Sequence, residues 1–269
     1  MYYICGMNTG LQLEFYKYQG TGNDFVMVDN RALSFPKENT ELVAFLCDRR
    51  FGIGADGLIL LENDNVSDFK MVYYNSDGNP STMCGNGGRC IVAFARDLGI
   101  IQGETTFNAV DGLHHATLVK DVVSLQMIDV TLVEQRDKYY FVNTGSPHHV
   151  QLVKDLPKLK VKEEGAKLRY GIYGEKGSNI NFVEAIDAET YAVRTYERGV
   201  EDETLSCGTG VTAVALSMYA AKKTDVKRIQ IKAMGGDLEV SFEHQEDGSF
   251  TKVRLKGSAK QVFSGVIKC

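Results

Sequence analysis

Two cysteines occupy the same short motif at widely separated positions. Cys84 lies in TMCGNGGRC and Cys207 in LSCGTGVTA, so both motifs read C-G-x-G, and they stand 123 residues apart. A cysteine that begins a helix is shifted toward its thiolate, because the helix dipole and the first backbone N–H groups favour an anion there. Two such thiols on opposite sides of one carbon can remove a proton from one face and supply one to the other. This is the chemistry that a racemase needs.

The glycines beside the two cysteines suit an anionic ligand. Glycine lets the backbone approach a ligand closely and exposes its N–H groups, which can hold a carboxylate at a helix N-terminus. The carbon between an ammonium and a carboxylate is a very weak acid, so a racemase must stabilise a carbanion-like transition state, and preorganised N–H donors do this. The two motifs therefore favour an enzyme that inverts an amino-acid carbon.

The segments around the two cysteines repeat as well. A strand-like alternation and a polar loop precede each motif, FKMVYYN with SDGNPST in the first half and TYAVRTY with ERGVEDET in the second. Apolar residues at helical spacing follow each motif and predict helices at about 87–98 and 209–222. A weaker correspondence joins GTGNDFVMV to TGSPHHVQLV. The repeat predicts two related domains that face each other across a cleft.

The domain boundary is expected at about 125–140, where LQMIDVTLVEQRDKYY loses its regular pattern. We expect an N-terminal half at 12–130 and a C-terminal half at 131–257. A terminal strand at about 258–269 can return to the first half, and 1–11 forms a short tail.

Most of the remaining chain is typical of short strands. The fold class is therefore predicted to be α+β, with a curved sheet wrapped around a central helix in each half. Two further helices are expected, at about 40–50 and 158–165. The expected strands are 12–18, 24–29, 57–62, 68–75, 104–110, 114–119, 122–128, 138–143, 147–153, 178–186, 189–196, 228–233, 237–243, 249–256 and 261–267.

Composition and charge exclude several classes of protein. The chain has 269 residues, and 30 Lys and Arg against 35 Asp and Glu give a net charge of −5. This balance argues against binding to nucleic acid, which needs a basic face. The apolar runs are too short to span a membrane, and the N-terminus has no signal-peptide pattern. We expect a cytoplasmic protein with no nucleic-acid or membrane partner.

The other four cysteines show no pattern that carries chemistry. No C-x-x-C pair is present, which argues against a zinc or dithiol site, so no metal is expected. Cys47 and Cys90 fall in apolar patterns typical of small buried residues, and Cys5 and Cys269 lie near the ends. The G-x-G-x-x-G in FGIGADG follows a helix pattern and precedes a strand, the reverse of a dinucleotide-binding motif, and is interpreted as a turn.

Motifs along nearly the whole chain match one family. They are GTGNDFVMVDN, CDRRFGIGADGLILL, YYNSDGNPSTMCGNGGRC, NTGSPHHV, SNINFVEA, YERGVEDETLSCGTG and GSAKQVFSGVI. On these segments the sequence resembles the diaminopimelate epimerases. The resemblance implies an isomerase that needs no pyridoxal phosphate or other cofactor and interconverts LL- and meso-2,6-diaminopimelate for lysine and peptidoglycan precursor synthesis. It also implies two pseudo-symmetric domains, each a barrel-like sheet around a helix, and a homodimer.

The resemblance also implies roles for single residues. Cys84 and Cys207 match the two catalytic cysteines, His148 and Glu197 match residues that tune the thiols, and Phe263 matches an aromatic residue of the dimer contact. The positions that match substrate contacts are Asn23, Asn75, Gly85, Asn86, Asn179, Glu197, Arg198, Gly208 and Thr209.

These roles fit the chemistry of the side chains. Arg198 can form a two-pronged contact with a carboxylate, Glu197 can accept from a substrate ammonium, and His148 can hold a proton near neutral pH. Gly57 and Ser146 are further candidate contacts, but some relatives have Gln in place of the glycine and many have Asn in place of the serine. Their changed side chains affect the grip on the substrate more than the reaction type.

Three other functions stay open on the sequence alone. A cofactor-free racemase of proline or hydroxyproline would use the same two thiols. A hydrolase would use Cys84 as nucleophile and His148 as base, and would be indifferent to Cys207. A binding module or thiol–disulfide protein would use the two thiols as a redox pair.

Overall fold

The computed structural model describes residues 12–269, which form two compact units. Unit 1 holds the described residues up to Val123 together with Ala259–Cys269, and unit 2 holds Ser124–Ser258. The last strand of the chain therefore belongs to the same unit as the first. The tail expected at 1–11, with Cys5, lies outside the described residues.

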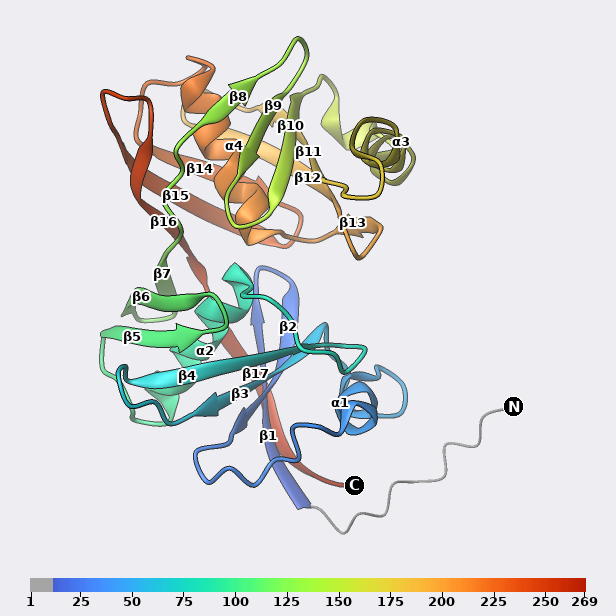
Figure 1. Cartoon of the computed structure of the whole chain (residues 1–269), viewed down its shortest axis with the longest axis vertical. Coiled ribbons are helices and arrows are strands. Elements are labelled where there is room, and N and C mark those ends of the chain that lie inside the picture. The colour runs from blue at the N-terminus through green and yellow to red at the C-terminus, as the bar shows by residue number, and fades with distance from the viewer. Residues whose placement is uncertain (1–11) are drawn as a thin grey trace. The chain divides into compact units, whose positions relative to one another are not determined.

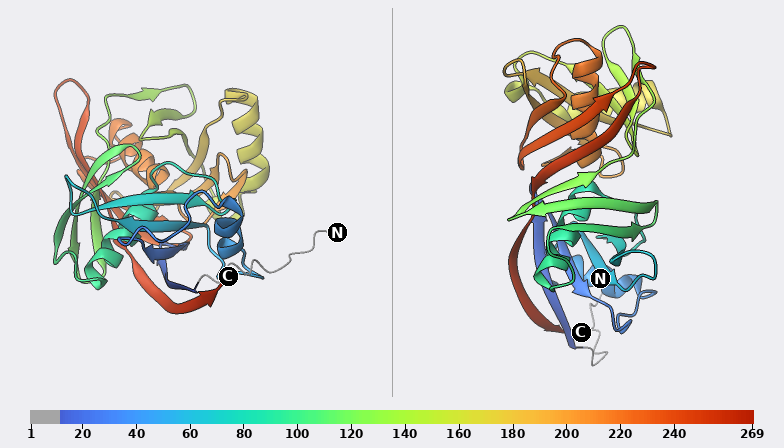
Figure 2. Two further views of the ribbon diagram at one scale, coloured as in Figure 1. Left: turned by 60° about the horizontal axis from the view of Figure 1, so that its bottom comes forward. Right: turned by 90° about the vertical axis from the view of Figure 1, so that its left-hand side faces the viewer.

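Unit 1 is built on a mixed sheet (Figure 1). Its strands pair in the order β17–β1–β2–β3–β4–β5–β6. The pairs β2–β3 and β4–β5 are parallel, and the other four pairs are antiparallel. Figure 2 shows β17 running beside β1 along its length, in the register from Gln12 with Lys268 to Gln19 with Lys260. The elements are β1 (Gln12–Gly20), β2 (Asn23–Asp29), α1 (Thr40–Cys47), β3 (Gly57–Glu62), β4 (Phe69–Asn75), α2 (Gly85–Asp97), β5 (Glu104–Ala109), β6 (Gly112–Val119), β7 (Val122–Gln126) and β17 (Lys260–Lys268).

Unit 2 repeats this connectivity. Its strands pair in the order β8–β9–β10–β11–β12–β14–β15–β16, and from β9 to β15 the sense is again antiparallel, parallel, antiparallel, parallel, antiparallel. The division between the two units falls within β7, after Val123. The elements are β8 (Val133–Gln135), β9 (Tyr140–Asn143), β10 (Pro147–Leu152), the 3₁₀ turn η1 (Leu156–Lys158), α3 (Val161–Tyr173), β11 (Asn179–Ala185), β12 (Thr190–Glu197), β13 (Asp202–Thr204), α4 (Gly208–Ala220), β14 (Arg228–Ala233), β15 (Gly236–His244) and β16 (Phe250–Ser258).

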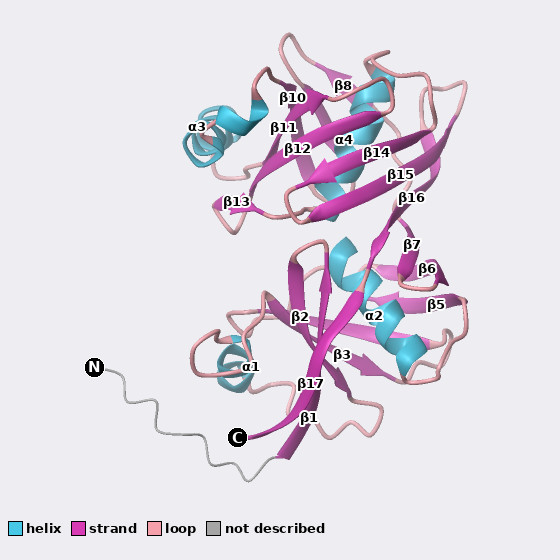
Figure 3. Ribbon diagram, turned by 180° about the vertical axis from the view of Figure 1, so that it is seen from behind, coloured by secondary structure: helices cyan, strands magenta, loops and turns pink. Residues whose placement is uncertain are grey.

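Each unit encloses one helix in its sheet. Helix α2 packs on β1, β2, β3, β6 and β17, and α4 packs on the strands from β8 to β12 and from β14 to β16 (Figure 3). Every residue from Gly85 to Ala95 is buried, and so is α4 from Gly208 to Met218 except at Thr209. A helix covered on nearly all sides needs small residues so that strands can approach it closely. The runs GNGG and TAVALS meet this need, and the predicted α+β fold of two pseudo-symmetric units is confirmed.

The sequence predicted the long elements and missed the shortest ones. The helices expected at 87–98 and 209–222 are present within two residues of their bounds. In place of the helix expected at 158–165 there are two separate elements, the 3₁₀ turn η1 (Leu156–Lys158) and the helix α3 (Val161–Tyr173). Strands β8 and β13 were not predicted, because three residues are too few to show an alternation.

Gly165 marks the point at which α3 comes closest to the sheet. A Cβ built on Gly165 would lie 2.4 Å from the Cβ of Tyr196, which is buried on β12. A Cβ on Gly171, in the same helix, would meet nothing within 4 Å. Only one of the two glycines is therefore required by packing.

We predict that Gly165→Ala lowers the free energy of unfolding by about 1–3 kcal/mol, the usual range for overpacking. Gly171→Ala is the matched control and should be neutral or stabilising, because alanine favours a helix interior over glycine by ~1 kcal/mol. Urea denaturation of both variants measures the difference. Equal stabilities would contradict the close contact between α3 and β12.

Candidate active site

Cys84 and Cys207 hold equivalent positions in the two units. Cys84 is the N-cap of α2 and Cys207 is the N-cap of α4, and both have extended backbones, with φ and ψ of −115° and 125° for Cys84 and −123° and 112° for Cys207. The first intrahelical bonds run from Gly88 N–H to the Cys84 carbonyl, 2.7 Å, and from Val211 N–H to the Cys207 carbonyl, 2.9 Å. The N–H groups before these have no acceptor inside the helix. Each half-buried thiol thus lies beside a set of N–H donors that can bind an anion.

Two asparagines lie against the thiol of unit 1. Asn23, the first residue of β2, places its Oδ1 at 3.6 Å from the Cys84 sulfur and at 3.3 Å from the Nδ2 of Asn86. The Nδ2 of Asn23 donates to Asp56 Oδ2 at 2.5 Å. The predicted contacts Asn23, Gly85 and Asn86 therefore gather around one sulfur.

An ionic network supports Asn23 from the other side. Arg49 contacts Asp24 and Asp56, both at 2.7 Å, and Lys17 reaches Asp24 at 2.8 Å. Burial alone would raise the pKa of Asp24, but the hydrogen bonds from Arg49 and Lys17 hold it well below its ordinary value. Asp56, the carboxylate that accepts from Asn23, is therefore held in place by Arg49.

Arg89 lies fully buried in the first turns of α2. Its Nη2 donates to Thr21 Oγ1 at 2.9 Å and to Asn86 Oδ1 at 3.0 Å, while its Nε and Nη1 have no hydrogen-bond partner among residues 12–269. Burial lowers its pKa, yet a guanidinium stays protonated in proteins. Arg89 therefore holds the amide of Asn86 in one orientation, because it can only donate.

A second polar group surrounds the thiol of unit 2. His148 on β10 is buried, and its Nε2 lies 2.9 Å from Thr209 Oγ1, which in turn lies 3.5 Å from the Cys207 sulfur. The Nδ1 of His148 lies 3.1 Å from the Nδ2 of Asn181 on β11. Thr209 thus links His148 to the Cys207 sulfur.

His148 is neutral in the folded protein. Burial lowers its pKa to about 3, and the positive charge of Arg198 acts in the same direction. The expectation that His148 holds a proton near neutral pH was therefore wrong, because the sequence did not reveal the burial of β10. A neutral imidazole can still link two hydrogen-bonding groups, because one ring nitrogen donates a hydrogen bond and the other accepts one.

The remaining predicted residues of unit 2 lie at the strand ends near this group. Asn179 donates from Nδ2 to Ser146 Oγ at 3.0 Å and accepts from the Arg198 backbone N–H at 2.9 Å. The Arg198 guanidinium reaches the Lys176 carbonyl at 3.0 Å and Ser146 Oγ at 3.5 Å. Ser146 is thus a shared partner of the amide and the guanidinium.

Three further predicted residues of unit 1, Gly57, Asn75 and Phe263, lie on β3, β4 and β17. Gly57 pairs with Asn75 across β3 and β4, and a Cβ on Gly57 would lie 2.5 Å from the Tyr73 ring. Packing therefore accounts for the glycine at position 57. Phe263 lies on β17, 46% exposed, with its ring perpendicular to that of Phe15 at 6.0 Å.

Sequence reasoning missed Asn181 and Arg89. Asn181 is two residues beyond Asn179 on β11, so both side chains point to the same face of the strand, and this spacing was a usable signal. Arg89 stands one helical turn after Asn86, also a usable signal, but its complete burial was not visible in a run of glycines.

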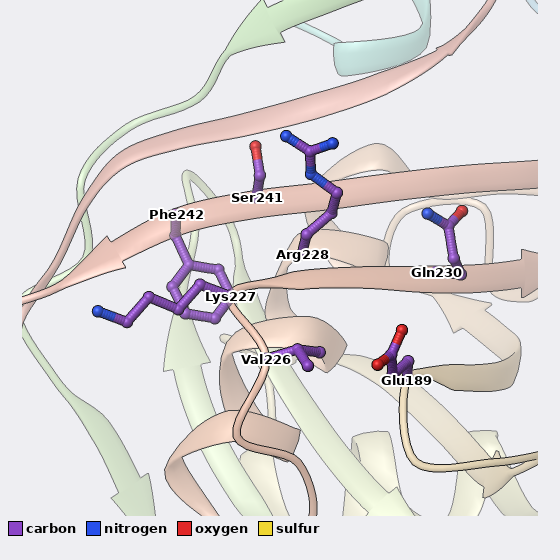
Figure 4. Close-up of a pocket in the computed structure, with 7 residues that line it drawn as sticks. All are labelled: Glu189, Val226, Lys227, Arg228, Gln230, Ser241 and Phe242. Carbon is purple, nitrogen blue, oxygen red and sulfur yellow. The ribbon is translucent and has the colours of Figure 1, made fainter.

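Two surface hollows of unit 2 lie away from these groups. One of about 470 Å³ lies over β14 and β15 and is lined by Glu189, Val226, Lys227, Arg228, Gln230, Ser241 and Phe242 (Figure 4). Another of about 790 Å³ includes Tyr219 at the C-terminal end of α4, roughly 18 Å along the helix from Cys207 at a rise of about 1.5 Å per residue. Neither hollow is lined by Cys84, by Cys207 or by the polar residues described around them.

Among residues 12–269, no group of three or more His, Cys, Asp and Glu side chains is placed to hold a metal ion. Within the same range, no helix has the length and apolar character that a membrane crossing requires.

The fold is shared with known racemases and epimerases and their structural relatives. It matches a hydroxyproline epimerase from Agrobacterium vitis with a TM-score of 0.73 and 15% identity, over 97% of this chain and 94% of that one. It also matches a phenazine biosynthesis protein of the PhzF family from Bacillus anthracis with a TM-score of 0.75 and 13% identity, over 96% and 99%. At these identities the likeness shows the α+β fold alone.

Sequence comparison gives the family. The model for diaminopimelate epimerase matches residues 15–133 and 140–261. The chain is 62% identical to the diaminopimelate epimerase of Flavobacterium psychrophilum, over 95% of this chain and 100% of that protein, and 40% identical to that of Chlorobaculum tepidum, over 92% and 98%. This chain belongs to the diaminopimelate epimerase family and is an isomerase, as the motifs predicted.

The buried histidines make stability depend on pH. The pKa of His148 is lowered to about 3, and burial lowers that of His149 to about 4. An unfolded histidine titrates near ~6.5. Below that pH the unfolded chain therefore binds protons that the folded chain does not, and the free energy of unfolding falls as the pH falls toward 4.

The slope of the free energy of unfolding against pH should therefore be smaller in variants that lack these histidines. We predict that His148→Gln and His149→Gln each reduce this slope by up to about 1.4 kcal/mol per pH unit, and that the double variant loses both contributions. Urea denaturation between pH 4 and pH 7 measures the slope. If wild type and variants lose stability in parallel, the histidines are not neutral in the folded state.

Proposed function

We propose that this protein interconverts LL- and meso-2,6-diaminopimelate with two thiols and without pyridoxal phosphate. One cysteine removes the α-proton as a thiolate, and the other delivers a proton to the opposite face as a thiol. The observation that carries the proposal is the equivalence of Cys84 and Cys207, each the N-cap of the enclosed helix in a unit of the same connectivity. Membership of the family supports the choice of substrate.

The helix N-termini would stabilise the charge that develops during inversion. When the α-proton leaves, electron density moves onto the substrate carboxylate, and N–H donors already aimed at that group lower the barrier. Gly85 and Asn86 supply such donors in unit 1, and Gly208 and Thr209 supply them in unit 2. The step needs no other electron sink at the α-carbon.

The polar side chains near the thiols suit the remainder of a zwitterionic substrate. The Arg198 guanidinium can bind a carboxylate with two hydrogen bonds, and Glu197, which accepts from Thr204 at 2.8 Å, can accept from an ammonium. Asn179 and Ser146 lie within hydrogen-bond distance of each other beside Arg198. We infer that the substrate contacts are those predicted from the sequence, with Asn75, Asn23 and Asn86 on the side of unit 1.

We also propose a homodimer formed through β17, in the cytoplasm, where lysine and peptidoglycan precursors are made. Among residues 12–269, strand β17 pairs with β1, and it exposes Val262, Phe263 and Val266, at 57%, 46% and 57%. An apolar edge strand is a ready template for pairing with a second chain. Burying these side chains between two copies removes that apolar surface from water.

We expect Cys84→Ser and Cys207→Ser each to lower the overall inversion rate about 10²–10⁴-fold, because each removes one of the two proton-transfer groups. Conversion of LL-diaminopimelate in heavy water, with deuterium uptake at the α-carbon, measures the rate without added pyridoxal phosphate. Cys90→Ala is the matched control, since Cys90 is buried inside α2 and should leave inversion intact.

The same assay separates the other functions. Full turnover in either serine variant would reject the two-thiol mechanism, and indifference to Cys207 alone would favour the hydrolase. Exchange into proline but not into diaminopimelate would favour a proline racemase. Activity that is retained after the thiols are oxidised, with no need for dithiothreitol, would show that they are not both required as thiols.

We predict that Phe263→Glu shifts the protein from dimer to monomer, because it places a charge in the apolar edge. Val66→Glu is the matched control: Val66 is 78% exposed in the loop between β3 and β4 and should keep the oligomeric state unchanged. Sedimentation equilibrium measures both masses. A dimer that persists in Phe263→Glu, or a monomeric wild type, would reject this interface.

A further inference from the structure

Arg169 is a buried cation that is not part of the proposed substrate contacts. It lies on α3, 8% exposed, with its guanidinium carbon 4.4 Å from the centre of the Tyr170 ring. A buried guanidinium needs partners for its N–H donors, because it gives up its hydration. The partners of Arg169 therefore show which parts of unit 2 it holds together.

The donors of Arg169 reach two separate segments of the chain. Its Nε donates to Glu201 Oε1 at 3.1 Å, in the turn between β12 and β13, and its Nη1 donates to the Gly174 carbonyl at 2.6 Å, in the connection from α3 to β11. This connection also approaches the guanidinium at Gly177, where a Cβ would lie 2.6 Å from the guanidinium carbon. Arg169 therefore joins the two segments through one planar group of fixed geometry.

The same two segments hold Arg198. This residue directly follows β12, and its exposed guanidinium donates to the carbonyl of Lys176, two residues after Gly174, at 3.0 Å. One segment thus carries the backbone of Arg198, and the other carries an acceptor for the end of its side chain. Joining the two segments fixes the direction of the guanidinium.

Glu201 closes the turn that carries Arg198. Its carboxylate accepts from the Gly199 backbone N–H at 3.1 Å and from the Tyr196 hydroxyl at 3.0 Å, and its own N–H donates to the Glu197 carbonyl at 2.8 Å. Glu201 has a φ of 56°, in the left-handed region that a residue with a side chain adopts where other contacts hold it. The bonds of the carboxylate supply such contacts.

Glu201 pairs with the charge of Arg169 and leaves that of Arg198 available. Burial would raise the pKa of Glu201, but the hydrogen bonds that its carboxylate accepts hold it below its ordinary value, so the group is ionised near neutral pH. The Arg198 guanidinium contacts two neutral acceptors, the Lys176 carbonyl and the Ser146 hydroxyl. These two contacts orient the guanidinium without neutralising it.

This inference rests on the proposed function, in which Arg198 binds a carboxylate of the substrate. The N–H donors of the helix starts serve the carboxylate beside the reacting carbon, so the guanidinium is available for the second carboxylate of diaminopimelate. We propose that Arg169 and Glu201 are positioning residues that direct Arg198 toward this second carboxylate. Both act through Arg198 and its turn, and they favour a substrate with a carboxylate at each end.

The kinetics of Arg169→Met test the proposal. Binding of the end that does not react is present in both the ground state and the transition state, so its loss raises KM more than it lowers kcat. In the deuterium-uptake assay, KM for diaminopimelate should rise about 10-fold, and kcat should fall less than about 3-fold. A kcat in this range also shows that the variant is folded.

Lys162→Met is the matched control. Lys162 lies on the same helix and pairs with Asp202, the residue after Glu201, at 2.5 Å, but both side chains of this pair are largely exposed. Because an exposed ion pair contributes little, KM should change less than about 2-fold. An unchanged KM in Arg169→Met, or an equal rise in both variants, would overturn the proposal.

Glu201→Gly removes the carboxylate from the turn while keeping a residue that adopts the left-handed backbone without strain. It should raise KM in the same way as Arg169→Met. Val200→Gly is its control, because Val200 is 57% exposed in the same turn and the variant gains backbone freedom but retains the carboxylate. Equal KM values in the two glycine variants would reject Glu201 as a positioning residue.

A double-mutant cycle shows whether Arg169 acts through Arg198. Arg198→Lys keeps the charge but cannot form the two-pronged contact with a carboxylate. In that background, the fall in kcat/KM caused by Arg169→Met should shrink from about 10-fold or more to less than about 2-fold. An undiminished fall would show that Arg169 acts independently of Arg198 and would reject the proposal.

Amide hydrogen exchange tests the positioning without substrate. Loss of the contacts made by Arg169 should speed exchange at the N–H groups of Gly199 and Glu201, whereas exchange in α4 should stay as in wild type, because local opening differs from global unfolding. Lys162→Met should leave both regions unchanged. Unchanged exchange in the turn of Arg169→Met, or an equal increase in α4, would contradict a local positioning role.

Failure of this inference differs from failure of the proposed function. The function is judged by α-proton exchange in the serine variants of the two cysteines, whereas amide exchange uses no substrate. If α-proton exchange needs both cysteines but Arg169→Met keeps the wild-type KM, the function stands and the positioning role is rejected. If α-proton exchange ignores one cysteine, the two-thiol function fails whatever the amide exchange shows.

Discussion

The unsatisfied N–H groups at the start of a buried helix are the constraint on which the rest of this structure depends. Backbone donors cannot be left in an apolar interior without a partner, so the N-terminal end of an enclosed helix must meet polar groups, water or a ligand. In this protein α2 and α4 are each covered by a sheet along their length, and each begins at a half-buried cysteine. Enclosing the helix and creating a site for an anion are therefore one structural requirement.

The glycines of the two C-G-x-G motifs show how one motif can serve different neighbours. A Cβ on Gly87 would lie 3.0 Å from the end of the Ile59 side chain, which is flexible and apolar. A Cβ on Gly210 would lie 2.5 Å from Oδ1 of Asn181. The second glycine of the motif thus makes room for a core side chain in unit 1 and for a buried amide in unit 2. The repeated backbone accommodates polar groups that are not repeated.

The sequence was sufficient for the longer elements and for placing the two cysteines at the starts of helices, because these depend on local patterns. Alternation over six to nine residues and helical spacing around Cys84 and Cys207 are set by the chain within one element. The state of His148 was not predictable in this way, since its burial depends on strands and a helix that are distant in the chain. The same holds for Asn181, whose orientation is set by Thr195 and by the carbonyl of His149.

A repeated fold gives two thiols the same backbone environment, and a two-base reaction requires that they differ in protonation. The helix dipole cannot produce this difference, because α2 and α4 begin in the same way and at equivalent positions. The difference must come from side chains that the two units do not share. Donor-only and acceptor-only groups are suited to this purpose, since a guanidinium, a carboxylate or a backbone carbonyl fixes the direction of every amide and imidazole that follows it. Buried polar residues that differ between the two units therefore give equivalent helix starts different surroundings.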